Sequence, residues 1–129
     1  YDAVRSGPDT EQSKKLWSRL SSAFSRRSAQ TTVLRASIDS SPYPVILCGD
    51  FNDTPVSFAL STLRSGSPKL FDAFALAGSG LGSTYVGDIP GLRIDYIMSS
   101  SSLEVVSFET HEIELSDHRP ISAVFISNR

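Results

Sequence analysis

The sequence predicts an α/β fold of the α+β kind, built on a mixed, mostly antiparallel β-sheet with helices beside it. Three observations favour this class. Apolar residues recur at helical spacing early in the chain. The apolar run 45–48 leads directly into a cluster of short polar residues, as strands often do where they end at a crevice. Segments rich in β-branched and aromatic residues, separated by turn signals, occupy the C-terminal part.

Length and composition indicate one globular domain. The chain has 129 residues and is 40% hydrophobic, which suits a single core. Its formal charge of −2 gives no basic footprint, so nucleic-acid binding is compatible with the sequence but is not indicated by its charge. No signal-peptide pattern and no apolar run of membrane-spanning length occurs. Because the chain opens at Tyr1 without an initiator Met, we expect a fragment, and the localisation stays undetermined.

A long helix is expected first. Breaker residues at 6–10, with Glu11 and Gln12 behind Thr10, favour a helix start there, and the Pro-containing stretch 40–44 ends it. The apolar stripe of this helix comprises Leu16, Leu20, Phe24, Val33, Leu34 and Ile38. The cations that decorate it, expected to form a solvated face, are Lys14, Lys15, Arg19, Arg26, Arg27 and Arg35.

The run 45–48 then predicts a strand that is buried on both faces. Cys48 is the single cysteine and cannot form an internal disulfide, so we expect a buried structural thiol. A second helix should begin at Pro55, capped by Asp53 or Thr54, with Phe58, Leu60 and Leu63 as its apolar members.

The remaining elements are shorter. Residues 70–77 predict a helical turn that ends at Gly78, and the Gly- and Ser-rich run 78–83 predicts a loop. Residues 99–102 are all serine and predict a polar turn. The expected strands, several of them paired antiparallel, are 83–86, 93–98, 103–112 and 120–127.

Three polar groups stand at the ends of these strands: Gly-Asp-Phe-Asn at 49–52, Arg-Ile-Asp-Tyr at 93–96, and Ser-Asp-His-Arg-Pro at 116–120. Each group alone is also explained by local structure, since Asp and Asn form Asx-turns and Ser caps loops. Together they favour a site. Asp95 is the most informative residue, because a carboxylate within an apolar and aromatic run is costly to bury without a partner. A histidine would supply that partner.

In this order and at this separation, GDFN, RIDYI and SDHRP resemble the three C-terminal motifs of the endonuclease/exonuclease/phosphatase superfamily, whose fold is like that of deoxyribonuclease I. The resemblance extends over essentially the whole chain. It implies that residues 1–129 form the C-terminal half of a four-layer α/β sandwich, with helices on the outer face of the sheet and the N-terminal half absent.

The resemblance also implies catalytic roles. Asp50 would orient or deprotonate the attacking water, and the amide of Asn52 would hold a phosphoryl oxygen without adding negative charge. His118 would donate to a phosphoryl oxygen in the transition state. Asp95 would hydrogen-bond His118, fixing its tautomer and favouring its protonated form.

A metal ion is the implied cofactor. Asp117 matches an acid that can join the metal shell directly or through water, with Asp50 as a second candidate, and hard oxygen ligands of this kind suit Mg²⁺ or Mn²⁺. The family's principal metal-binding Glu lies in the absent half, so we expect poor metal affinity and an inactive fragment.

Five further residues lie near the motifs. Tyr85, with Thr84 beside it, lies where the family often contacts substrate. His111 matches no motif and is expected to be a solvent-facing strand residue. Arg93 and Tyr96 are expected to provide packing and charge balance around Asp95.

The leading function is therefore a metal-dependent phosphoesterase that hydrolyses a phosphodiester or phosphomonoester. The alternative is a non-catalytic binding or structural module derived from the same fold. The sequence does not decide which phosphate ester is the substrate. A sheet face left bare by the absent half would favour a homodimer, and the apolar residues expected on it are Val45, Leu47, Ile94, Val124 and Ile126.

Overall fold

A computed structural model of the chain describes residues 10–87 and 89–128, with only part of the side chains in the stretch 10–24. It is a mixed α/β structure, as predicted. The helices are α1 (Thr10–Asp39), α2 (Phe58–Arg64) and α3 (Ala73–Ala77), and the strands are β1 (Ile46–Asp50), β2 (Leu70–Asp72), β3 (Asp95–Ser100), β4 (Leu103–Thr110) and β5 (Ile121–Ser127). The described helices include none with enough uninterrupted apolar sequence to cross a bilayer.

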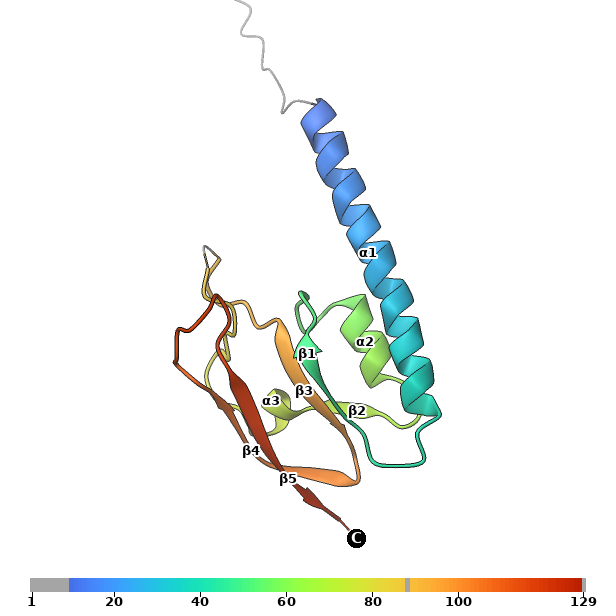
Figure 1. Cartoon of the computed structure of the whole chain (residues 1–129), viewed down its shortest axis with the longest axis vertical. Coiled ribbons are helices and arrows are strands. Elements are labelled where there is room, and N and C mark those ends of the chain that lie inside the picture. Colours follow the sequence, from blue (N-terminus) through green and yellow to red (C-terminus); the bar gives the residue numbers. More distant parts are fainter. Residues whose placement is uncertain (1–9, 88, 129) are drawn as a thin grey trace, which may run out of the picture.

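All strand pairs are antiparallel. β3 is the centre of a three-stranded sheet with β1 on one side and β2 on the other, and β4 and β5 form a second, two-stranded sheet. Figure 1 shows α1 and α2 together at one flank of the three-stranded sheet and the β4–β5 pair at the other. β3 therefore lies in the middle of the molecule, and this explains why Tyr96 to Ser100 are buried along its whole length.

The hydrophobic core lies between the helices and this sheet. Its buried members are Ile38, Leu60, Leu63, Leu70, Tyr96 and Met98, and Val45, Leu47 and Phe51 pack against them. The rings of Phe51 and Tyr96 meet edge to face, with centroids 5.7 Å apart, which is a favourable aromatic geometry. The core therefore joins the start of the candidate site, at Phe51, to the middle of β3.

The predicted long helix is confirmed as α1, but Arg35 does not belong to a solvated face. Its guanidinium is buried and donates to the carbonyls of Leu63 at 2.6 Å and Pro68 at 2.8 Å, with Asp39 paired on its own helix. Lys14, Lys15 and Arg26 are exposed as expected. Within the apolar stripe, Ile38 is buried whereas Val33 and Leu34 are exposed. The described side chains do not include those of Leu16, Leu20 and Phe24 of the stripe, nor that of Arg19.

The expectation of a strand buried on both faces is wrong for β1. Ile46 is 50% exposed and Cys48 is an exposed free cysteine, whereas Leu47 between them packs on the core. β1 is an edge strand of its sheet, and only its Leu47 face meets the helices. Because successive side chains alternate between faces, the same strand carries a buried and an exposed row.

Two helix boundaries also differ from the prediction. α2 begins at Phe58, not Pro55, because Ser57 has an extended backbone and its side chain accepts a hydrogen bond from the Leu60 amide. The predicted turn at 70–77 divides into β2 and α3, since Asp72 ends the strand and caps the helix by accepting from the Phe74 amide. Gly78 ends α3, as predicted.

The C-terminal strands are confirmed with shifted ends, except that 83–86 forms no strand and makes one isolated bridge, from Tyr85 to His118. The predicted polar turn at 99–102 is too long by two residues. Ser99 and Ser100 are buried in β3, and the hydroxyl of Ser100 accepts from the Val45 amide at 3.0 Å. Pairing with β1 and β2 therefore extends β3 into the serine run.

The five residues expected on one bare sheet face do not share it. Val45 and Leu47 pack against the core and Ile94 is buried, whereas Val124 and Ile126 on β5 are each 55% exposed. The structure therefore gives no support to a dimer through that set of residues.

Candidate active site

The site forms at one end of the three-stranded sheet, where β1 ends and β3 begins. In the register of this pair, Asp50 lies directly opposite Asp95, so the two side chains lie on the same face of the sheet. His118 completes the group. Its Nδ1 lies 2.9 Å from Oδ2 of Asp95, and its Nε2 lies 3.7 Å from Oδ2 of Asp50. The partner predicted for Asp95 is thus present.

Backbone contacts bring the segment 116–119 to this end of the sheet. Residues 84–86 bind this segment on both sides of His118. The Val86 amide donates to the backbone carbonyl of Asp117, and the Arg119 amide donates to the backbone carbonyl of Thr84, both at 2.7 Å. The Tyr85 ring meets the imidazole edge to face, 5.8 Å between centroids. The Ser116 hydroxyl also accepts from the His118 amide. The capped loop considered from the sequence is therefore real, and it supports the site.

Negative charge surrounds the imidazole. The hydrogen bond to Asp95 raises the pKa of His118 above its ordinary value of 6.5, partial burial opposes this, and the charges of Asp95, Asp50 and Asp117 raise it further. Opposite charges near a titrating group favour its charged form. His118 is thus poised to carry a proton on both ring nitrogens and to donate from Nε2, which faces Asp50.

The turn after β1 is held from several sides. Oδ1 of Asp50 accepts from the Asn52 amide at 2.8 Å, and Asn52 has a φ of 49°, which Asn tolerates better than most residues. Arg27 of α1 donates to the Asn52 carbonyl at 3.0 Å. The hydroxyl of Tyr96 is directed at the carbonyls of Asp53 and Arg93, both at 2.8 Å. Asp50 thus uses one oxygen for an Asx-turn and presents the other to His118.

The donor set bears on the expected metal. Asp50, Asp95 and His118 each offer a ligand atom within 4.8 Å of the others, and this is the one such group among the described residues. Two carboxylates suit Mg²⁺ or Mn²⁺, so Asp50 and Asp95 fit a divalent cation, whereas His118 with a proton on both ring nitrogens would not be a ligand. Asp117 is exposed and does not belong to it. Of the two aspartates expected to bind the metal, Asp50 therefore belongs to this group and Asp117 does not.

Arg93 does not balance the charge of Asp95, contrary to the prediction. It pairs with buried Asp72 at 2.7 Å, and its guanidinium lies over the rings of Phe74 and Tyr96, 4.5 and 4.8 Å from their centroids. Burial raises the pKa of Tyr96 well above its ordinary value, although the positive charge of Arg93 lowers it in part. Arg93 and Tyr96 therefore pack against each other and do not contact the Asp95 carboxylate in the described interactions.

His111 lies just past the end of β4. Its Nε2 is 2.8 Å from the Ser122 hydroxyl and its Nδ1 is 3.5 Å from Glu109, and the side chain is partly exposed. It is therefore a partly exposed residue near a strand end, close to the expectation; its backbone amide donates to the carbonyl of Pro120 at 2.9 Å, whereas its ring bonds to Ser122 and Glu109 and not to the Asp50–Asp95–His118 group.

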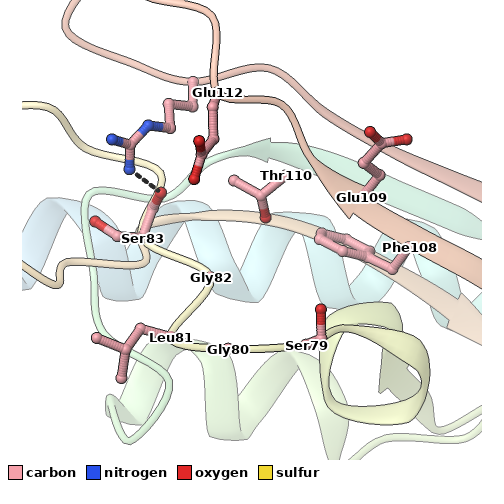
Figure 2. Close-up of a pocket in the computed structure, with 10 residues that line it drawn as sticks. Ser79, Gly80, Leu81, Gly82, Ser83, Phe108, Glu109, Thr110 and Glu112 are labelled. Carbon is pink, nitrogen blue, oxygen red and sulfur yellow. Dashed lines mark hydrogen bonds between the residues drawn. The ribbon is translucent and has the colours of Figure 1, made fainter.

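An open pocket of about 450 Å³ lies between the loop 79–83 and the end of β4. Figure 2 shows Ser83 and Glu112 at one end of it and Ser79 and Phe108 at the other. Asp50, Asp95 and His118 do not line it, and Arg119, whose guanidinium donates to the Ser83 carbonyl, is its link to the site. The sequence identified this loop but carried no sign of a pocket, because the wall comes from a strand distant in sequence.

The fold agrees with the comparisons to known proteins. Residues 15–118 match the endonuclease/exonuclease/phosphatase family, and the chain belongs to that family. Among curated proteins, no significant match to the sequence is found.

Solved structures of similar fold include an endonuclease/exonuclease/phosphatase from Bacteroides vulgatus, at 27% identity and a TM-score of 0.69, over 79% of this chain and 44% of that one. A functionally unknown conserved protein from Enterococcus faecalis has 24% identity and a TM-score of 0.67, over 82% and 46%. A mannosyl-6-phosphatase from Bacteroides thetaiotaomicron has 22% identity and a TM-score of 0.55, over 81% and 44%. The chain thus spans less than half the length of these solved chains.

Proposed function

We propose that these residues form the Asp–His part of a metal-dependent phosphoesterase, which hydrolyses a phosphodiester or phosphomonoester with water. The observation that carries this proposal is the convergence of Asp50, Asp95 and His118 at one end of the sheet. Membership of the endonuclease/exonuclease/phosphatase family supports the same reaction class.

In the proposed mechanism, Asp50 accepts a proton from the attacking water as the water approaches phosphorus. His118 donates from Nε2 to a phosphoryl oxygen and so neutralises charge that builds up in the transition state. Asp95 holds Nδ1 and keeps the imidazole oriented. Asn52 offers its side-chain amide to a second phosphoryl oxygen. The leaving oxygen departs on the side opposite to the water.

A divalent cation, when bound, polarises the phosphoryl oxygens and stabilises the leaving oxygen. Asp50 would hold it, and Asp117, which lies outside the Asp50–Asp95–His118 group, would contribute through water. Because the described residues supply few fixed ligands, we expect weak metal binding and little turnover by the 129-residue chain on its own.

The substrate is proposed only as a phosphate ester. The formal charge of −2 does not favour a dedicated nucleic-acid enzyme. One protein of similar fold is a mannosyl-6-phosphatase, and another, the catalytic domain of human Nocturnin, holds a sulfate anion. Tyr85, whose ring lies against His118, is a candidate contact for the substrate.

A second candidate is a binding or structural module without turnover. It is favoured by the share of the solved chains that this chain covers, 44% and 46% for the first two, since residues contributed by the rest of those chains would then be lacking.

Turnover of p-nitrophenyl phosphate and bis(p-nitrophenyl) phosphate by the full-length protein, with Mg²⁺ or Mn²⁺, tests the proposal. Asp50→Asn and His118→Ala should each reduce kcat about a hundredfold or more. His111→Ala is the matched control and should leave kcat unchanged. Near-normal turnover by both site variants would overturn the proposal. A lack of turnover by the unmodified protein would favour the non-catalytic module.

A further inference from the structure

Thr84 lies at the junction of the two segments that form the Asp95–His118 pair. It is fully buried, with 0% of its surface exposed. Its hydroxyl oxygen accepts hydrogen bonds from the backbone amides of Ile94 at 3.1 Å and Asp95 at 3.2 Å. A buried polar group of this kind is retained only when it is well paired. The expectation that Thr84 would contact substrate is therefore not supported by its position.

The backbone of Thr84 binds the other segment. Its carbonyl accepts from the amide of Arg119, the residue after His118, at 2.7 Å. Its own amide donates to Leu92 at 2.9 Å and holds Thr84 close to the start of β3. One residue thus contacts the backbone at Asp95 through its hydroxyl and the backbone beside His118 through its carbonyl.

This arrangement matters because the Asp95–His118 hydrogen bond joins two segments that are otherwise distant in sequence. The 2.9 Å separation requires both backbones to be fixed relative to each other. β3 is anchored by its neighbours β1 and β2, but the 116–119 segment lies outside any strand. Within the described residues, its contacts with residues 83–86 hold it in place.

We propose that Thr84 is a positioning residue for the Asp95–His118 pair, and that its hydroxyl sets where the Asp95 carboxylate meets the imidazole. It touches no reacting atom, and it acts through the backbone of Asp95. The catalytic consequence rests on the proposed phosphoesterase function, but the geometry of the pair does not, so the test reads that geometry directly.

The test is the tautomer of His118 in the ¹⁵N-labelled 129-residue chain, read from its ring nitrogen and proton resonances at one pH of about 9, where an ordinary imidazole is neutral. In the unmodified chain, Asp95 should hold the proton on Nδ1. Thr84→Val keeps the shape but removes the acceptor, and the pure Nδ1–H signal should be lost. Thr84→Ser keeps the acceptor and should restore the signal.

Two controls separate positioning from general disturbance. Ser83→Ala removes a neighbouring hydroxyl that bonds to Tyr85 and Leu92 and not to Asp95, and it should leave the His118 signal intact. The His111 resonances, from a ring that bonds to Ser122 and not to Asp95 or His118, report whether each variant is folded. A folded Thr84→Val chain with an unchanged His118 tautomer would overturn the proposal, as would an equal loss in Ser83→Ala.

If Thr84→Val does not fold, amide exchange in the unmodified chain still decides. The Ile94 and Asp95 amides should exchange at least tenfold more slowly than those of exposed loop residues 79–81, because the hydroxyl protects both. Rapid exchange of both amides in the folded chain would show that the hydroxyl does not hold them.

Discussion

At the scale of single residues, the site depends on groups that serve two purposes. Asp50 uses Oδ1 for the turn after β1 and turns Oδ2 toward His118. Local and functional explanations of the same residue are therefore compatible, because a carboxylate has several acceptor positions. His118 is similar, since Ser116 caps its amide while Asp95 binds its ring.

Asp95→Asn should lower the pKa of His118 toward its ordinary value, because the first cause of the raised pKa is the hydrogen bond to this carboxylate. When the pKa of a histidine is higher in the folded state than in the unfolded state, protonation stabilises the fold. This stabilisation is complete at a pH below the unfolded-state pKa of about 6.5 and is lost as the pH rises through the folded-state pKa. The stability difference between wild type and Asp95→Asn should thus be larger near pH 6 than near pH 9. NMR titration and urea unfolding in chelator measure the two effects, with His111 as internal reference.

At the scale of elements, short caps and one buried cation decide where the helices begin and how they pack. Pro55 suits a first helical position, yet the helix starts later because Ser57 satisfies the Leu60 amide. α1 is joined to α2 and to the turn after it through Arg35, whose exposed fraction is 8%. Both outcomes depend on hydrogen bonds that compete with simple propensity.

Ser57→Ala should destabilise the chain by about 1 kcal/mol through loss of the cap. Two matched variants sharpen the result. Ser61→Ala, at an exposed position inside α2, should be neutral or slightly stabilising, and Thr54→Ala, at the cap first expected, should have little effect. Chemical unfolding measures all three. A larger loss for Thr54→Ala than for Ser57→Ala would mean that the helix begins earlier than described.

Arg35→Met should destabilise the chain by about 3 kcal/mol or more, because the carbonyls of Leu63 and Pro68 lose charged donors that supply roughly 1.5–3 kcal/mol each. Arg26→Met is the control on the same helix. Arg26 is exposed and makes no hydrogen bond or ion pair with the described residues, so its change should stay within about 0.5 kcal/mol. Equal effects in urea unfolding would contradict the anchoring role of Arg35.

At the scale of the whole molecule, the site is open. Asp50 is 39% exposed, and the strand that carries it is the edge of its sheet. Metal sites gain affinity from several fixed ligands held in advance, and the described residues bring only one group of three together.

We therefore expect the 129-residue chain to bind Mg²⁺ weakly, with a dissociation constant no tighter than the millimolar range typical of the weakest protein sites, about 10⁻³ M. Isothermal calorimetry measures this, with Asp50→Asn as the variant that should abolish any remaining heat. Tight binding with a stoichiometry of one would show that these residues complete a metal site by themselves.

Several elements of the fold and one feature of the site could be predicted from the sequence, because they depend on patterns within short segments. The long helix, the strands from Leu103 onward and the Gly-rich loop follow from periodicity and turn residues. A carboxylate at position 95, within an apolar run, required a partner, and the partner is His118. Nearby residues in the chain decide the helix, the strands and the loop, so these elements form whatever packs around them. The need of Asp95 for a partner follows from its place in an apolar run.

The tertiary structure alone decided which side chains are buried and which distant segments meet. Cys48 is exposed because only one face of β1 is covered, and Arg35 is buried because α2 and the following turn lie against it. Thr84 binds Asp95 across eleven residues. Such contacts depend on the register and docking of whole elements, which periodicity does not encode, since one pattern fits either face until a neighbour covers it.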